Sequence, residues 1–450
     1  MKIDHESREI LKYISEDFVM LVTASRTVAY HIGSGDELGK DGFTQYCAKH
    51  YGDILIEVPG KTEAEPPTEK RMAAGEIWWS WNDPQRRVVR RLVMEPTSLP
   101  ENDDNPEVFN RWHVLKQTMA ERDTTATADS IAILAQHLMY LSGGDVVGVT
   151  FFLCWLAQLY QTPEIKMPTA VLFYSKYGRV GKNLMQRLLT KVFGKPLVGG
   201  CTGKQLQKNF DDAIEHKRIV FINEMARSEK VDGYENFKSQ ISEEDIQFEG
   251  KNRASKEIRN VAHFVVTTNH DDALPLMEND GRIAVLRCLE PRRDDAYYKE
   301  LVEWIDGPGA GALAQILATW KFPKDWDPHA PVPQTAAARA MQTAARGDLV
   351  CLIEDLIQEH APPFDKDIGR IMDMIPQLDT AYSAVLKGTR LNARTLPAAL
   401  ERLGHSQLRM INFTAEGGVW KTARVWCWRN REQWDNMPPQ EVAVAMGLTK

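Results

Sequence analysis

The segment from Ala170 to Leu289 most constrains the fold, because short apolar runs alternate there with stretches of helix-like sequence. These runs are AVLFY, RIVFI, HFVVTT and IAVLRC. Strands that alternate with helices are typical of a layered α/β domain with a mostly parallel sheet. The sequence therefore predicts an α/β core, and in open sheets of this kind ligands bind beyond the carboxyl ends of the strands.

A glycine-containing loop follows the first run, because SKYGRVGKN occupies Ser175–Asn183 and the helix-like LMQRLLTKVFG comes next. A loop between a buried strand and a helix N-terminus can hold phosphates with backbone N–H groups and a lysine. We therefore predict an ATP site with Mg²⁺. Its phosphate-binding residues are Gly178, Arg179, Val180, Gly181, Lys182 and Asn183. Lys176 replaces the usual first glycine and Asn183 the usual Ser or Thr, so an ordinary surface turn is the alternative.

The next two runs end at polar side chains. Asn223 and Glu224 follow the second run, and Asn269 follows the third. Glu224 could polarise the water that attacks a γ-phosphate, and Asn183, Asn223 and Glu224 could hold the metal. Asn269 could sense the γ-phosphate. A strand that simply stops at a polar cap is the alternative for each, but their order along the sheet favours a catalytic site.

Arg282 stands at the start of the fourth run. It could reach the ATP of a neighbouring subunit as an arginine finger, and an ordinary surface arginine is the alternative. We expect all four motif elements to lie at the carboxyl edge of the sheet.

With these motifs in this order, the chain resembles the superfamily 3 helicases of phages and plasmids, especially the helicase part of phage-type primase-helicases. Three segments outside the core add to the likeness. Pro106–Trp112 resembles the family's "yNlW" segment, Trp155–Pro163 its lead into the loop, and Pro333–Met341 its "P.T.a…M" segment. The resemblance implies a P-loop NTPase core of the AAA+-like type. It also implies a hexameric homo-oligomeric ring that hydrolyses ATP between subunits and translocates on single-stranded or forked DNA in replication.

The resemblance also implies roles by position. Lys182 would be the phosphate-binding lysine, Glu224 the catalytic acid, Asn269 the sensor and Arg282 the finger. Gly281 stands where the family often has a second arginine. The family's primase half has little room before Pro106, so a separate primase or replication initiator is an expected partner.

The family places a β-hairpin with basic residues between the second and third runs. Phe248–Lys256 occupies that position and contains Lys251, Arg253 and Lys256. Such cations hold DNA phosphates without reading bases, which suits a translocating motor. A solvated charged loop is the alternative.

Four parts are expected along the chain. They are an N-terminal α+β module (1–115), a helical collar (116–165), the motor (166–330) and a C-terminal helical or winged-helix-like domain (331–450). In the first, the tryptophans of IWWSWNDPQRRVVRRLV could stack on DNA beside its arginines, or simply form the core. In the last, Leu396–Leu403 is expected to be a helix, and VWKTARVWCW resembles a hairpin that could serve as the wing.

Composition excludes little. A net charge of −7 and 43% apolar residues are ordinary for a folded protein, and the six cysteines form no CxxC pair. Val146–Leu159 is too short to span a bilayer. We therefore expect a protein of the bacterial host cytoplasm with no membrane partner. A DNA-stimulated ATPase that loads or remodels other proteins, and a catalytically decayed nucleotide- or DNA-binding scaffold, are the alternatives.

Overall fold

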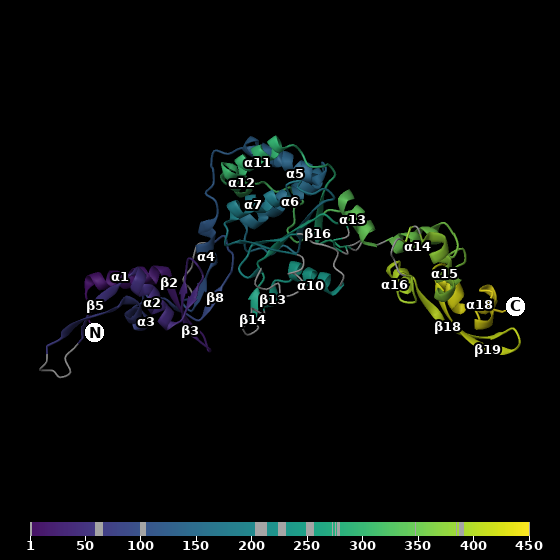
Figure 1. Ribbon diagram of the computed structural model, residues 1–450, viewed down its shortest axis with the longest axis horizontal. Coiled ribbons are helices and arrows are strands. Elements are labelled where there is room, and N and C mark those ends of the chain that lie inside the picture. Colours follow the sequence, from purple (N-terminus) through teal and green to yellow (C-terminus); the bar gives the residue numbers. More distant parts are fainter. Residues whose placement is uncertain are drawn as a thin grey trace. The chain divides into compact units, whose positions relative to one another are not determined.

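The structure is a computed structural model (Figure 1). It describes residues 2–58, 66–99, 105–202, 214–223, 231–248, 256–271, 273–274, 276, 280–346, 348–383, 385–386 and 391–449. The chain forms two compact units. The first comprises Met1–His270 and Gly281–Thr335, and the second Asp271–Asp280 and Ala336–Lys450.

A parallel β-sheet forms the centre of the first unit. Its strands are β10 (Ala170–Ser175), β11 (Val198–Thr202), β12 (Ile219–Asn223), β15 (His263–Thr268) and β16 (Ile283–Cys288). They are ordered β11-β12-β15-β10-β16, and every neighbouring pair is parallel. β10 and β15 are buried along their whole length. Burial on both faces explains why these runs are continuously apolar, and it confirms the α/β core predicted from them.

Helices cover both faces of this sheet. Figure 1 shows α5, α6, α7, α11 and α12 on one side and α10 on the other. Their bounds are α5 (Ala132–Ser142), α6 (Val146–Gln161), α7 (Lys182–Phe193), α10 (Val231–Ser242), α11 (Asp295–Asp306) and α12 (Gly309–Thr319). The first group shares one apolar core with the sheet. Within the described ranges, no helix has both the length and the apolar character needed to cross a membrane.

The N-terminal part of the first unit is mixed α+β. Its elements are β1 (Lys2–Ile3), α1 (His5–Asp17), β2 (Phe18–Val22), β3 (Thr27–His31), β4 (Glu37–Leu38), α2 (Lys40–His50), β5 (Asp53–Val58), β6 (Thr68–Ala73), α3 (Ala74–Ser80), β7 (Val88–Val89), β8 (Arg91–Val93) and β9 (Val108–Asn110). A short helix α4 (Trp112–Leu115) and two 3-10 helices, η1 (Lys116–Thr118) and η2 (Ala128–Ile131), connect it to α5.

The second unit combines helices with a small antiparallel sheet. Its elements are α13 (Ala336–Arg346), α14 (Asp348–Gln358), β17 (Ile368–Gly369), α15 (Ile371–Tyr382), α16 (Thr395–Arg402), β18 (Ser406–Ala415), β19 (Val419–Cys427), α17 (Arg431–Asn436) and α18 (Pro439–Ala445). The strand order is β17-β19-β18. The prediction that the sequence VWKTARVWCW itself forms a hairpin is therefore wrong. This sequence provides the single strand β19, which pairs with the preceding strand β18.

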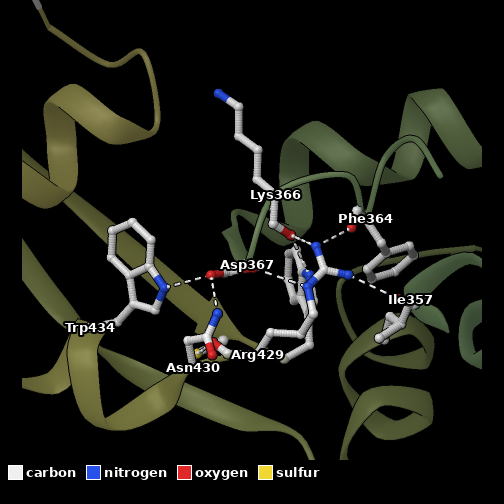
Figure 2. A network of polar contacts seen from close by, with 9 residues as sticks. Ile357, Phe364, Lys366, Asp367, Arg429, Asn430 and Trp434 are labelled. Atoms are coloured by element: carbon white, nitrogen blue, oxygen red, sulfur yellow. Dashed lines mark hydrogen bonds and ion pairs between the residues drawn. The ribbon is translucent and has the colours of Figure 1, made fainter. Parts of the chain in front are cut away.

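A polar network holds the end of β19 (Figure 2). The Arg429 guanidinium donates to Asp367 Oδ1 at 3.0 Å and to the carbonyls of Ile357 and Phe364 at 2.8 Å each. Asn430 donates to the other Asp367 oxygen at 2.8 Å. The network therefore fastens β19 to the segment that follows α14.

Candidate functional site

The loop between β10 and α7 lies at the carboxyl edge of the parallel sheet. Two of its residues have left-handed backbone conformations, Arg179 with φ 59° and Gly181 with φ 94°. A Cβ atom added at Gly181 would lie 2.7 Å from His137 Cε1. Backbone conformation and space therefore both require glycine at position 181, where the chain turns into α7.

The N-terminus of α7 has no side-chain cap, because its N-cap residue is Gly181. The first N–H groups of a helix have no partner within the helix, and they carry a partial positive charge. This end of α7 is therefore suited to an anion.

The Lys182 side chain joins the loop to the end of β15. Its Nζ atom donates to the Thr268 carbonyl at 2.8 Å and to Asn269 Oδ1 at 2.5 Å. Burial lowers the pKa of Lys182 to about 8. The structure thus brings the expected phosphate-binding lysine and the expected sensor into direct contact.

Asn223 lies at the end of β12, beside β15. Its Nδ2 atom donates to Gln186 Oε1 at 3.0 Å, and its Oδ1 atom accepts from the Thr267 hydroxyl at 3.1 Å. The amide expected to hold a metal therefore bridges α7 and β15. Glu224, the expected catalytic acid, lies outside the described residues.

Asn183 is exposed on α7 and lines a shallow groove of about 380 Å³. The other lining residues are Gln186, Arg187, Thr190 and Lys191. Among the residues that the structure describes, no group of three or more His, Cys, Asp or Glu side chains is placed to hold a metal ion. The metal set Asn183, Asn223 and Glu224 therefore stays a prediction.

His137 of α5 contacts the loop at Gly181. Its Nε2 atom lies 3.4 Å from the Gly181 carbonyl, and its Nδ1 atom lies 2.8 Å from the Tyr297 hydroxyl. A carbonyl oxygen only accepts, so Nε2 carries the proton and Tyr297 donates to Nδ1. Burial lowers the pKa of His137 to about 4, so the ring is neutral near pH 7. Sequence reasoning missed this residue, because a single histidine in an apolar helix gives no signal of its partners.

Arg282 lies at the opposite edge of the sheet. It precedes β16, and its carbonyl accepts from the N–H of Ala170, the first residue of β10. Its Nε atom donates to the Ser242 hydroxyl at 2.8 Å. The expectation that all four motif elements share the carboxyl edge is therefore wrong for Arg282, because a residue that starts a parallel strand lies at the other end.

The expected DNA-binding hairpin is described only at its base. β13 (Asp245–Phe248) and β14 (Lys256–Arg259) pair in antiparallel register, with Phe248 opposite Lys256. Lys251 and Arg253 lie outside the described residues, and the structure gives the backbone but not the side chain of Lys256.

The tryptophan-rich segment serves the N-terminal core. Trp78 is fully buried and Trp81 is 5% exposed. Arg86 donates to the Trp78 carbonyl at 3.1 Å, and Arg87 donates to the Val108 carbonyl at 2.9 Å. The alternative of a structural core is thus confirmed for Trp78 and Trp81.

Comparisons with known proteins relate parts of the chain to a family of unknown function and to a phage protein. A family of unknown function (DUF5906) matches residues 173–288. A DNA primase-polymerase of Nitratiruptor phage NrS-1 is 26% identical over 183 residues, which are 39% of this chain and 25% of that protein. The match thus spans a quarter of the curated relative. The chain is therefore related in sequence to part of a phage primase-polymerase.

Solved structures of the NrS-1 C-terminal region share the fold. One apo structure has a TM-score of 0.59 at 16% identity and covers 94% of this chain and 99% of that chain. A second, the A form, has a TM-score of 0.56 at 16% identity and covers 93% and 98%. At this identity the likeness concerns the fold alone.

Proposed function

We propose that this chain is an ATP-hydrolysing motor of the superfamily 3 helicase type that moves along single-stranded DNA during replication of a phage or other mobile element. The observation that carries the proposal is the contact of Lys182 Nζ with the Thr268 carbonyl and Asn269 Oδ1, at the carboxyl edge of a parallel sheet. A half-buried lysine in this position, next to an uncapped helix N-terminus, is suited to a triphosphate.

The described residues fit a nucleotide. The left-handed turn at Gly181 leads the chain into the N-terminus of α7, and a Cβ atom at position 181 would collide with His137. Lys182 would exchange its two oxygen acceptors for phosphate oxygens. Asn269, released from Lys182, would orient the attacking water, and Glu224 would accept its proton. ATP, when bound with Mg²⁺, supplies the phosphoanhydride bond whose hydrolysis drives movement.

Two observations support DNA as the partner. The curated relative is a DNA primase-polymerase. The paired strands β13 and β14 occupy the position at which a basic hairpin is expected, with Lys251 and Arg253 between them in sequence and Lys256 at the start of β14. Cations on a hairpin that lines a channel would hold phosphates without reading sequence.

The position of Arg282 supports a ring. Because Arg282 and Lys182 lie at opposite edges of one sheet, Arg282 can serve only the ATP site of another subunit. Head-to-tail contacts of this kind close into rings when the rotation between subunits allows it. We propose that Arg282 leaves Ser242 and contacts the neighbour's phosphates.

The test is steady-state ATP hydrolysis with Mg²⁺ by the full chain, with and without single-stranded DNA. We expect turnover that DNA raises, and that Lys182→Ala and Glu224→Gln abolish. Glu224→Gln should still bind nucleotide, whereas Lys182→Ala should bind it weakly. Wild-type-like turnover in Glu224→Gln would remove Glu224 from catalysis.

A decayed nucleotide-binding scaffold is the second candidate, and the Asn223 contacts favour it. This amide is hydrogen-bonded at both ends, to Gln186 and Thr267, at a position where a motor usually has a metal-binding acid. Nucleotide binding without turnover in the folded wild type would select the scaffold. Turnover without strand displacement on a forked duplex would instead select a DNA-stimulated ATPase that loads or remodels other proteins.

A further inference from the structure

The β18–β19 hairpin of the second unit has one covered face and one open face. The covered face carries Ile411, Phe413, Ala423 and Val425, which pack in one cluster with α18. The open face carries three cross-strand pairs, which are Met410 with Arg424, Asn412 with Thr422 and Thr414 with Trp420. All six residues of these pairs are exposed.

Trp420 is the largest side chain on this open face, and 69% of it is exposed. Its cross-strand partner is Thr414, and next to this pair the Thr422 hydroxyl donates to Asn412 Oδ1 at 2.8 Å. A flat aromatic ring set among hydroxyl and amide groups is suited to stacking with a planar, polar partner such as a nucleobase.

Charge in this part of the chain favours a polyanion. Residues 391–430 contain six Lys and Arg against two Glu, a net charge of +4, whereas the whole chain has −7, and of these cations Arg429 is paired with Asp367 outside the range. Arg424 lies four residues from Trp420 on the same strand, which corresponds to about 13 Å. Lys421 is exposed next to Trp420, but it pairs with Phe413 and therefore lies on the other face of the hairpin. The open face itself has no carboxylate among its six residues.

The base of the hairpin is firmly held. The Arg429–Asp367 ion pair, at 3.0 Å, and the bond from Asn430 to Asp367 fix the end of β19 (Figure 2). In addition, Trp426 and Trp428 are buried in a core with the helices. A ring presented by a fixed strand loses little conformational freedom when a ligand binds.

We propose that the open face of the β18–β19 hairpin is a binding site for single-stranded nucleic acid. Trp420 stacks on an unpaired base, and Arg424 contacts phosphates. This site lies in the second unit and needs no nucleotide hydrolysis, so it is separate from the motor site at Lys182.

The experiment measures binding of a fluorescein-labelled oligothymidylate to the full chain by fluorescence anisotropy, without ATP. Trp420→Ala is expected to weaken binding about tenfold, because one base–aromatic stack is lost. Trp420→Phe should retain most of the affinity. Met372→Ala is the matched control, because Met372 is 68% exposed on α15 and carries no charge. It should bind like the wild type.

Salt dependence provides a second readout. Arg424→Ala should reduce the slope of log affinity against log salt concentration by about 0.7, the value for one phosphate contact on a single strand. Unchanged affinity in both Trp420→Ala and Arg424→Ala would overturn the proposal. So would light scattering that shows loss of self-association in Trp420→Ala with DNA binding intact, because the face would then be an interface between copies. Hydrolysis measured on the same samples reports separately on the motor proposal.

Discussion

The Nζ atom of Lys182 lies 2.5 Å from the Oδ1 atom of Asn269, although the two residues are 87 positions apart in sequence. The contact joins the start of α7 to the end of β15. Lys182 is therefore held in place before any ligand arrives, and an incoming anion would compete with two neutral oxygen atoms for its ammonium group. This arrangement makes the charge state of Lys182 the first property to test.

Nucleotide affinity should fall as pH rises above about 8. Burial lowers the pKa of Lys182 to about 8, so the free protein progressively loses this charge above that pH. A bound triphosphate favours the charged form, so binding then requires uptake of a proton. Titration with a fluorescent ATP analogue at several pH values measures the effect. Lys182→Arg is the control, because arginine stays charged and its profile should be flat. A wild-type affinity that does not change with pH would contradict the role of the Lys182 charge in nucleotide binding.

Removing the His137 contacts should loosen the loop at Gly181 without unfolding the protein. His137→Phe keeps an aromatic ring but loses both hydrogen bonds, so backbone amides from Gly178 to Lys182 should exchange hydrogen faster. Nucleotide binding should weaken by about tenfold, which corresponds to the net contribution of about one or two hydrogen bonds.

His137→Gln provides the matched control, because its amide can donate to the Gly181 carbonyl and accept from Tyr297. It should restore both the slow exchange and the affinity. Equal exchange in His137→Phe and the wild type would show that the histidine only fills space.

The sequence was sufficient for the core strands and for placing Lys182 and Asn269 at the same edge of the sheet, because parallel strands buried on both faces leave long apolar runs. The prediction was wrong for Arg282, because this residue stands at the start of a strand and therefore lies at the opposite edge of the sheet. The sequence also led to the wrong prediction of a hairpin within VWKTARVWCW, which forms the single strand β19. The support of Gly181 by His137 could not be predicted, since no local pattern links positions so far apart.

Lys166 should make stability depend on pH in the alkaline range. Burial, reinforced by the nearby Arg218, lowers the pKa of Lys166 to about 7. The unfolded chain then binds more protons than the folded one from about pH 7 up to the ordinary lysine pKa, so the folded state gains stability as pH rises through this window. The slope is up to about 1.4 kcal/mol per pH unit.

Lys166→Met should remove this slope, so its stability relative to the wild type should be highest near pH 7 and decline toward pH 10. Thermal unfolding at several pH values measures the difference. Lys299→Met, at an exposed lysine on α11, is the control and should run parallel to the wild type. If the stability of Lys166→Met changed with pH as that of the wild type does, the lowered pKa of Lys166 would not be the cause of the slope.

The Arg429 network should stabilise the second unit. Arg429→Ala removes hydrogen bonds to one carboxylate and several carbonyls, and we expect a loss on the order of 3 kcal/mol in the free energy of unfolding. Burial opposes ionisation of Asp367, but hydrogen bonds from Asn430, Arg429 and Trp434 outweigh it and lower its pKa. This stability is present above the ordinary aspartate pKa and is lost as pH falls through the lowered value.

Denaturant unfolding followed by limited proteolysis of the second unit measures the Arg429→Ala effect. The variant should also lose part of the acid-induced decline that begins as pH falls below the ordinary aspartate pKa. Wild-type stability in this variant would mean that the buried tryptophans alone hold β19.

The most direct test of the central claim is steady-state ATP hydrolysis with Mg²⁺, with and without single-stranded DNA, in the wild type and in Lys182→Ala. The motor proposal predicts turnover that DNA raises and that the substitution abolishes. No turnover by the folded wild type under either condition, or equal turnover in Lys182→Ala, would contradict it.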